Sequence, residues 1–267
     1  MIKFFRKIRQ NLLAKGNIKQ YFFYAIGEIV LVVFGILIAL NINNRNEEYK
    51  NGKIEKEILE QLKEEYQFNL IQLEQKIAMR NQIIKASMDV LSYIDKPEQE
   101  VSKETLYAKI RFLNIDPTFD PIENNIIGSG SIRFLKNKEL KKRLSNWSSD
   151  IRAVQEMELQ WQKTTTDLNT PFQIKLGILR DMEHENYQKE AAPIFIIGET
   201  KGNKLVLGKS RTSPSVKSIV ENNELEGLIV LAIRTNNTAN LQSVVLKERI
   251  IEILKLINEG LNGRNRY

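Results

Sequence analysis

The sequence predicts a mainly α-helical protein: a transmembrane helix near the N-terminus, then a long helix, then a helical bundle outside the cytoplasm. Three observations predict this fold class. The 267-residue chain has a long apolar run near its start, only 6 Pro and 13 Gly, and apolar residues that recur at helical spacing over most of the remainder. An apolar share of 42% permits a hydrophobic core.

The net charge of +7 is concentrated at the N-terminus. Residues 1–20 hold six Lys or Arg side chains and no acidic one, so residues 21–267 carry a net charge of only +1. A nucleic-acid-binding protein is expected to carry a basic face on its folded domain. The sequence therefore predicts no nucleic-acid partner, and it assigns the basic residues to a cytoplasmic tail.

Residues 21–42 predict a transmembrane helix, with the lipid bilayer as its partner. An apolar run extends from Ile29 to Leu40, and four aromatic residues occupy positions 21–24, as expected at a bilayer interface. Twenty helical residues rise about 30 Å, which matches the hydrocarbon core of a membrane. No second run reaches this length, so we expect a single pass. The alternative is a buried core helix of a soluble protein.

The charges that flank the span predict its orientation. Cations alone precede it and mixed charges follow it, which places the N-terminus in the cytoplasm. The predicted regions are a cytoplasmic basic tail (1–20), a transmembrane helix (21–42) and an extracytoplasmic helical domain (43–267). A cleaved signal peptide is the alternative, but no A-x-A-like site follows Ala39. We expect an uncleaved signal anchor.

The span contains one acidic residue and a stripe of small ones. An ionised Glu28 inside hydrocarbon is unfavourable unless it has a partner. Gly27, Gly35 and Ala39 fall on one helical face, where small residues let two helices approach closely. These four residues are candidates for pairing, either with a second copy or with another membrane protein. A monomeric anchor with Glu28 near the headgroups is the alternative.

Residues 47–95 predict one long helix that can continue from the span. Apolar residues recur every three, four or seven positions over about twelve turns. They are Ile54, Ile58, Leu62, Tyr66, Leu70, Leu73, Ile77, Ile84, Met88 and Leu91. Arg80 and Ser87 interrupt this seam, which favours a bundle over a coiled coil. Lys96 and Pro97 are expected to end the helix.

Capping residues predict three further helices in the middle of the chain. One is expected from the N-cap candidate Ser102 to about Leu113. A short one is expected over 120–128, where Asp120 can cap, Pro121 suits the first position, Glu123 completes a capping box and Gly128 can end the helix. A third is expected to begin near Ser131 or Asn137 and to run to about Asn169.

The last third of the chain is less regular. Thr170 and Pro171 predict a helix toward Met182. Within residues 186–220, Ile194–Ile197 and Leu205–Leu207 are short apolar runs, which predict either a small β-hairpin or an ordered loop. A closing amphipathic helix is expected over 223–261.

Two stretches resemble a known family. Residues 4–47, FFRKIRQNLLAKGNIKQYFFYAIGEIVLVVFGILIALNINNRNE, resemble the N-terminus of a bacterial family of single-span membrane proteins, domain of unknown function 6090. Residues 129–147, SGSIRFLKNKELKKRLSNW, resemble its central segment. The matching positions there are Ser129, Gly130, Asn137, Leu140 and Trp147. The resemblance implies a Gram-negative inner-membrane protein with a periplasmic helical domain, and it implies no activity and no role for these residues.

The residue types argue against most catalytic and metal sites. The chain has no Cys and a single histidine, His184, which we expect to be solvated at a helix end. Ser129 or Ser131 with Lys136 would make a Ser-Lys pair, but a lysine-rich helical protein offers such pairs by chance. The glycines of segment 128–134 can cradle an anion, yet a sharp turn between helices is favoured. We expect no cofactor.

Paired carboxylates and tryptophans have structural interpretations. Glu64 with Glu65, and Glu156 with Glu158, are expected on solvent-facing sides of helices. Trp147 and Trp161 are expected in the core.

We therefore expect a non-enzymatic, membrane-anchored interaction or scaffold protein whose external domain binds an envelope protein. The alternatives are a single-span sensory domain that signals through a separate cytoplasmic partner and an envelope hydrolase with an unrecognised site.

Overall fold

The computed structural model describes residues 18–96, 100–123, 126, 128–188 and 205–263, with Ile18, Gln20, Tyr21 and Tyr24 described by their backbone alone. The chain divides into two compact units, residues 1–58 and 59–267. Each unit is described by itself. Most of the basic tail predicted for residues 1–20 lies outside the described residues.

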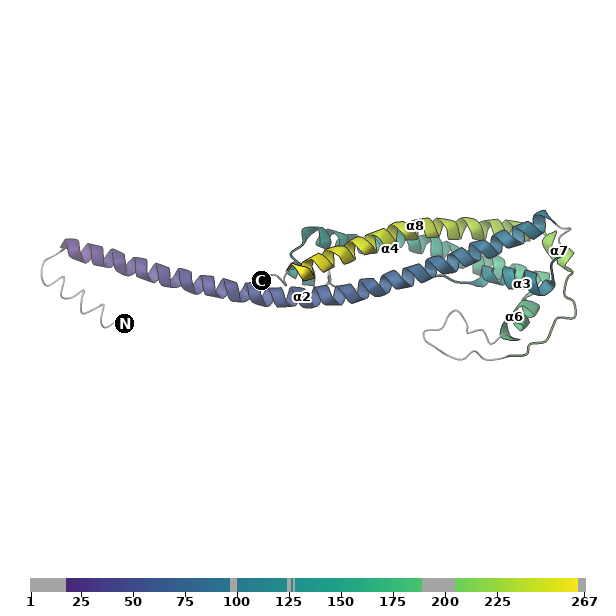
Figure 1. Cartoon of the computed structure of the whole chain (residues 1–267), viewed down its shortest axis with the longest axis horizontal. Helices are drawn as coiled ribbons and strands as arrows, with labels where there is room; N and C mark the ends of the chain where they lie inside the picture. The colour runs from purple at the N-terminus through teal and green to yellow at the C-terminus, as the bar shows by residue number, and fades with distance from the viewer. Residues whose placement is uncertain (1–17, 97–99, 124–125, 127, 189–204, 264–267) are drawn as a thin grey trace. The chain divides into compact units, whose positions relative to one another are not determined.

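The described part of the first unit is the beginning of helix α2 (Ile18–Asp95), drawn in purple in Figure 1. It is the single helix among the described residues that is long and apolar enough to cross a membrane, and none of its apolar window is buried. A core helix of a soluble protein would be covered by the rest of the chain. The predicted apolar N-terminal helix is confirmed, and the exposure of its apolar window argues against the core-helix alternative.

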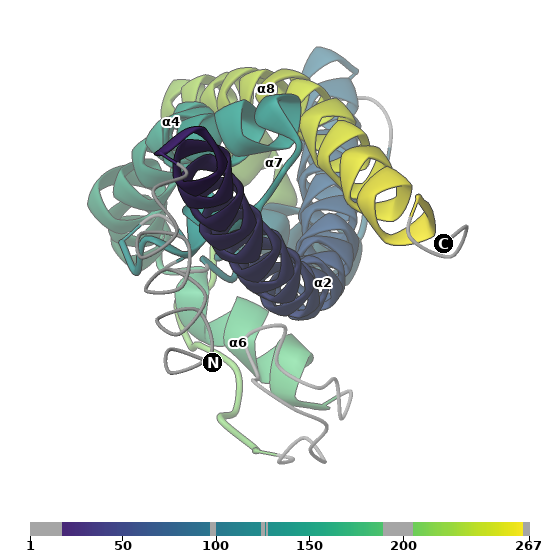
Figure 2. The same ribbon diagram turned by 90° about the vertical axis from the view of Figure 1, so that its left-hand side faces the viewer.

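The second unit is a bundle of three long helices. The later part of α2 lies beside α4 (Lys138–Thr164) and α8 (Asn223–Asn262), as Figures 1 and 2 show. Side chains join α2 to each of the other two helices. Tyr66 of α2 packs against Trp147 of α4, with ring centroids 4.9 Å apart. Lys247 of α8 lies 2.6 Å from the carboxylate of Glu74 on α2.

Shorter helices complete this unit. They are α3 (Lys103–Ile110), the 3₁₀ turns η1 (Arg111–Asn114) and η2 (Ser131–Phe134), the π-helical turn η3 (Thr165–Asn169), α5 (Thr170–Leu176), α6 (Leu179–Gln188) and α7 (Val216–Val220). A buried cluster joins α3, α5, α6 and α7 to the ends of α2 and α8. It includes Ile83, Val90, Ile110, Trp161, Phe172 and Ile229. The prediction of a mainly helical fold is confirmed.

Side-chain caps explain where four of the helices begin. Ser102, Asn137, Ser215 and Asn222 precede α3, α4, α7 and α8, and each accepts a hydrogen bond from a backbone N–H in the first turn. Such caps satisfy donors that a helix leaves unpaired. The predicted N-cap Ser102 and the predicted start near Asn137 are therefore confirmed. The other predicted start, Ser131, is the first residue of the 3₁₀ turn η2.

Two predicted helices differ from the structure. Residues 120–123 are not helical, and Ile126 and Gly128 lie in turns, so the short helix over 120–128 is wrong. Backbone groups in this stretch bond to side chains of α2 instead. The helix from Thr170 toward Met182 is interrupted at Gly177, whose φ of 75° ends α5 before α6 begins.

The predicted hairpin is not confirmed. Leu205–Leu207 is described and is not a strand, and α7 follows shortly after it. The other apolar run, Ile194–Ile197, lies outside the described residues. What the structure describes of segment 186–220 is therefore the end of α6, an irregular stretch and one short helix.

Candidate functional site

An extended segment, Ile115–Ile122, runs between the helices of the second unit. Its buried residues alternate with more exposed ones: Ile115, Pro117, Phe119 and Pro121 are buried. This is the period of a β-strand. It has no neighbouring strand among the described residues, and a buried backbone needs hydrogen-bond partners.

Side chains of α2 and α4 supply those partners. Asn69 clamps Ile122, because its amide nitrogen donates to the Ile122 carbonyl (3.0 Å) and its oxygen accepts from the Ile122 N–H (2.8 Å). Gln72 accepts from the N–H of Asp120 (3.0 Å). From α4, the Trp161 indole donates to the carbonyl of Ile115 (2.8 Å). The helices therefore satisfy the backbone groups that a second strand would satisfy in a sheet.

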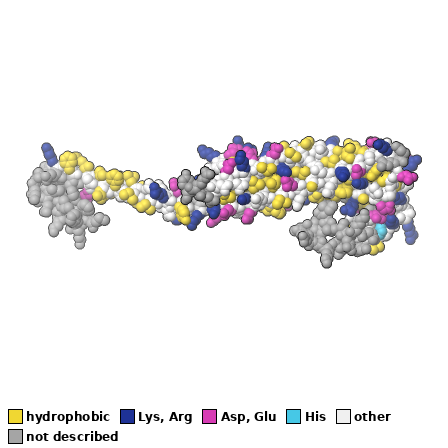
Figure 3. Space-filling view, in the orientation of Figure 1, with side chains coloured by type: hydrophobic (Ala, Val, Ile, Leu, Met, Phe, Trp, Pro, Cys, Tyr) yellow, Lys and Arg dark blue, Asp and Glu magenta, His cyan; other side chains and the backbone are white. Residues whose placement is uncertain are grey.

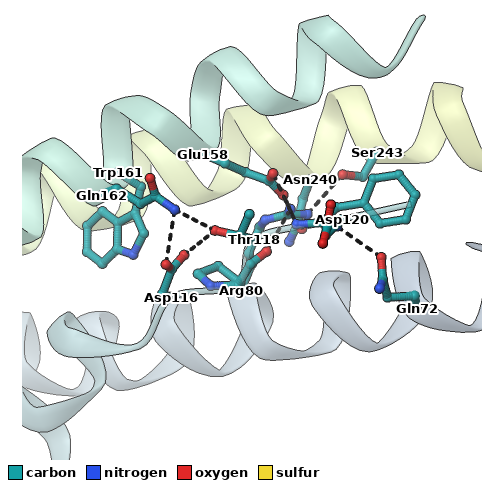
Figure 4. A network of polar contacts seen from close by, with 12 residues as sticks. Gln72, Arg80, Asp116, Thr118, Asp120, Glu158, Trp161, Gln162, Asn240 and Ser243 are labelled. Atoms are coloured by element: carbon teal, nitrogen blue, oxygen red, sulfur yellow. Dashed lines mark hydrogen bonds and ion pairs between the residues drawn. The ribbon is translucent and has the colours of Figure 1, made fainter. Parts of the chain in front are cut away.

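A buried ion pair lies at the centre of this arrangement (Figure 4). Arg80 of α2 pairs with Glu158 of α4, and their side chains are 0% and 3% exposed. The Arg80 guanidinium also donates to the carbonyl of Pro117 (3.2 Å) and to Ser243 Oγ (2.9 Å) on α8. Glu158 accepts from the N–H of Phe119 at 3.1 Å. One pair thus connects three helices and the extended segment.

Burial sets the protonation of this pair. Loss of water raises the pKa of Glu158 to about 7, against the opposing effects of Arg80 and of the Phe119 N–H. Burial also lowers the pKa of Arg80. An ionised pair of this kind is stable only when its other hydrogen-bonding groups are satisfied. The hydrogen bonds to the extended segment and to α8 meet much of that requirement.

One expectation from the sequence is corrected here. Glu158 was expected on a solvent-facing side of its helix, and it is buried, whereas Glu156 is exposed. The sequence spacing indicates this burial, because Glu158 continues the three- and four-residue spacing of the buried residues Ile151, Val154 and Trp161. Arg80 also occupies a buried position on the core side of α2. It interrupts the run of apolar residues there but keeps their spacing.

A small pocket opens at the end of the extended segment. Its lining residues come from α2, α4 and the stretch after Pro121; they are Leu62, Tyr66, Ile122, Glu123, Ile126, Leu144, Trp147 and Ser148. Burial of the Tyr66 phenol and the nearby carboxylates Glu65 and Glu123 raise the pKa of Tyr66. No local pattern in the sequence indicates this pocket, since its walls come from three separated segments.

The motif at residues 129–147 mostly builds local structure. Gly130 has a φ of 71°, which favours glycine, and it begins the turn η2. Asn137 caps α4 through the N–H of Leu140 (3.0 Å), and Leu140 is buried. Trp147 is buried as predicted and lines the pocket. Turn formation explains Gly130 and capping explains Asn137, which are two of the five motif positions.

The Ser-Lys hypothesis finds no support in the described geometry. Ser129 Oγ donates to Ser131 Oγ at 2.8 Å, and neither serine nor Lys136 lines the pocket. The favoured interpretation, a turn between helices, agrees with the left-handed conformation of Gly130.

His184 is half-buried rather than solvated. It lies within α6, and its Nδ1 accepts a hydrogen bond from the N–H of Gly208 at 3.2 Å. Arg180 of the same helix donates to the carbonyl of Leu207 at 2.7 Å. These residues hold the irregular stretch against α6. Among the described residues, no group of three or more His, Cys, Asp or Glu side chains is arranged to hold a metal ion.

The predicted membrane residues lie in the first unit. Gly27, Gly35 and Ala39 are exposed, and a Cβ added at either glycine would meet nothing within 4 Å. Glu28 is half-buried. The small residues therefore leave room for a second helix, and helix pairing stays a prediction.

One comparison with known proteins gives a match. The model of a family of unknown function (DUF6090) matches residues 28–147. No curated protein and no solved structure matches the chain. The matched range contains seven of the eight residues that line the pocket, all except Ser148. The predicted resemblance to this family is thereby confirmed over residues 28–147.

Proposed function

We propose that this protein is a membrane-anchored interaction protein, without enzymatic activity, whose helical unit binds a protein of the cell envelope. One observation carries the proposal: an exposed apolar stripe on α8. The stripe consists of Val230, Leu241, Val244, Val245 and Ile251, each between 46% and 63% exposed.

The stripe lies on the face of α8 opposite its buried residues. Leu241 comes 11 positions after Val230 and 3 or 4 positions before Val244 and Val245, and Ile251 comes 7 positions after Val244; each of these separations is close to whole helical turns. Figure 3 shows hydrophobic side chains among charged ones over the bundle. Contiguous apolar surface on a soluble domain marks sites of protein association. The stripe is therefore the best-supported contact surface for a partner.

The flanking charges in the sequence and the exposed apolar helix support the proposed location. Residues 21–42 cross the inner membrane once, the N-terminus is cytoplasmic, and the helical unit is periplasmic. The exposure of the apolar window of α2 supports insertion, because water would be an unfavourable surrounding for it.

The topology can be tested cleanly because the natural chain has no cysteine. We would introduce one cysteine at a time, as Lys15→Cys in the tail or Lys175→Cys in α5, where the lysine side chain is 80% exposed. A membrane-impermeant maleimide applied to spheroplasts should label only Lys175→Cys, and permeabilised cells should show both. Labelling of Lys15→Cys in intact spheroplasts would reject the proposed orientation.

The interaction can be tested by photo-crosslinking in cells. A photoreactive benzoylphenylalanine at Leu241 or Val245 should give a discrete adduct, whereas one at Lys175 or at Lys217, which is 78% exposed and off the stripe, should not. Adding Val244→Asp should abolish the adduct, because a charge would be desolvated in the interface. Equal adducts at stripe and control positions would reject the stripe as the contact surface.

Pairing of the membrane helix is a separate part of the proposal. The stripe of Gly27, Gly35 and Ala39 would let two spans pack closely, either as a homo-oligomer or with another membrane protein. Crosslinking in native membranes should recover a dimeric species that Gly35→Leu weakens. Recovery of monomer alone, unchanged by Gly35→Leu or Glu28→Gln, would remove this part of the proposal.

A further inference from the structure

The pocket in the second unit has a buried apolar floor. Leu62, Tyr66, Ile126, Leu144 and Trp147 line it, and each is no more than 6% exposed. Tyr66 and Trp147 meet at an interplanar angle of 57°, so two aromatic rings form one side of the floor. Such a floor favours an apolar group over water.

The mouth of the pocket has a different character. Ile122, Glu123 and Ser148 form it, and all three are exposed. Glu123 provides a carboxylate, and Ser148 provides a hydroxyl that can accept a hydrogen bond from an ammonium group. Glu123 lines the pocket, and burial of Tyr66, with smaller contributions from Glu65 and Glu123, raises the pKa of the Tyr66 phenol. The mouth therefore favours a positive charge and disfavours a negative one.

The size of the pocket limits its ligand. It has space for about three water molecules, which is the volume of roughly five non-hydrogen atoms. A ligand that fits has a short apolar chain for the floor and one charged group for the mouth. A second charge at the far end would be buried without a partner.

We propose that this pocket binds a short alkylammonium group, with its apolar chain against Tyr66 and Trp147 and its charge beside Glu123. This inference goes beyond the proposed function, because the pocket and the α8 stripe share no residue. Two sources can present this chemistry: a free alkylamine, or an apolar side chain followed by a basic residue in a peptide.

The test uses the full chain in lipid nanodiscs and observes ligand protons by saturation-transfer NMR. n-Butylammonium should bind saturably in the millimolar range. 1-Butanol, which lacks the charge, and butyrate, which reverses it, should each bind at least fivefold more weakly. Cadaverine, a diamine, should also bind more weakly than n-butylammonium, because one of its two charges would enter the apolar floor.

Two variants give the matched comparison. Glu123→Gln should weaken n-butylammonium binding about fivefold and leave 1-butanol binding unchanged, while Glu64→Gln, an exposed carboxylate of α2 outside the lining, should change neither. Glu123 is exposed, so its substitution should not impair folding. A far-ultraviolet circular dichroism spectrum and a melting temperature check this for both variants.

The two sources are separated by a second ligand series. Acetyl-leucyl-lysine amide carries its charge on the residue after the apolar side chain, and tighter binding of this peptide than of n-butylammonium would assign the site to a peptide. Tighter binding of n-butylammonium would assign it to a free amine. Equal binding of 1-butanol and n-butylammonium, no effect of Glu123→Gln, or no saturable binding would each overturn the proposal.

Discussion

The two halves of α2 are built from the same secondary structure and place their apolar residues in opposite ways. From Phe22 to Ile42 the large apolar side chains are between 43% and 73% exposed, on every side of the helix. From Leu59 to Val90 one side of the helix is buried, with Leu73, Ile83 and Val90 at 0%, and only Phe68, Ile71 and Met88 among the large apolar side chains are 50% or more exposed. The first half needs an apolar solvent, whereas the second half is covered by its own chain.

Periodicity, more than hydrophobicity, distinguishes the two halves of α2. A helix that is apolar all round has no preferred face, and a helix with a stripe has one. The polar side chains of the second half also lie on its packed side. Asn69, Gln72 and Arg80 form hydrogen bonds with the backbone of the extended segment. Substitutions can therefore test whether each half depends on the surroundings we assign to it.

The largest effect is expected where the packed half carries its buried charge. Glu158→Ala leaves the Arg80 guanidinium buried without a carboxylate, and it should lower the free energy of unfolding by about 3 to 5 kcal/mol. Chemical unfolding in nanodiscs, followed by circular dichroism, measures this. The double variant Arg80→Met with Glu158→Leu should recover most of the loss. If the double variant recovers no stability, the ion pair stabilises the folded protein by more than the neutralisation of the buried Arg80 charge.

A pair of apolar truncations sets the two halves directly against each other. Ile83→Ala should lower the free energy of unfolding by about 2 to 4 kcal/mol, because it leaves a cavity in a site that is 0% exposed. Leu31→Ala, at a site that is 64% exposed, should change it by less than about 0.5 kcal/mol. Similar losses for both variants would contradict the division of α2 into two environments.

Loss of one clamp on the extended segment should have a smaller effect. Asn69→Ala removes both hydrogen bonds to Ile122 and should lower the free energy of unfolding by about 1 to 3 kcal/mol. Hydrogen exchange of the Ile122 amide should quicken more than that of amides in α8. Asn44→Ala, in the exposed half of α2, serves as the matched asparagine control. An unchanged exchange rate at Ile122 would show that the hydrogen bonds from Asn69 are not needed to hold the extended segment in place.

A pH dependence of stability is expected from Glu158. Its pKa is raised in the folded protein to about 7, so the folded state holds a proton there that the unfolded state releases at lower pH. Stability from this group is fully present below its ordinary pKa and is lost as the pH rises to about 7. The difference in unfolding free energy between the natural protein and Glu158→Gln should therefore decline over that range. A difference that grows with pH would show that Arg80 outweighs burial.

The sequence predicted the helices well because their signals are local. Ser102 and Asn137 cap the helices they precede, and the apolar spacing of α2 is visible in a single stretch of chain. The same local rules predicted a helix from Asp120 and Pro121. They failed there because the competing partners, Asn69 and Gln72, lie about 50 positions away, which no local pattern shows.

The candidate sites were predictable to different degrees. Trp147 was found by resemblance, and its burial by spacing, but the pocket also needs Tyr66 and Ile126, which come near it only in the folded chain. The spacing of Glu158 from Ile151, Val154 and Trp161 indicated a buried position. The prediction instead followed the general preference of carboxylates for solvent. A polar residue at a core position deserves consideration as a buried partner whenever an oppositely charged residue occupies another core position.

The extended segment has a consequence for the order of folding. Its anchors Arg80 and Glu158 are 78 positions apart, and its backbone finds partners only after α2 and α4 have come together. Closing so long a loop costs conformational entropy, and this cost is offset only once the contacts between the joined segments have formed. The segment should therefore order late, after the transition state, so that changes to it quicken unfolding and leave the rate of folding almost unaltered.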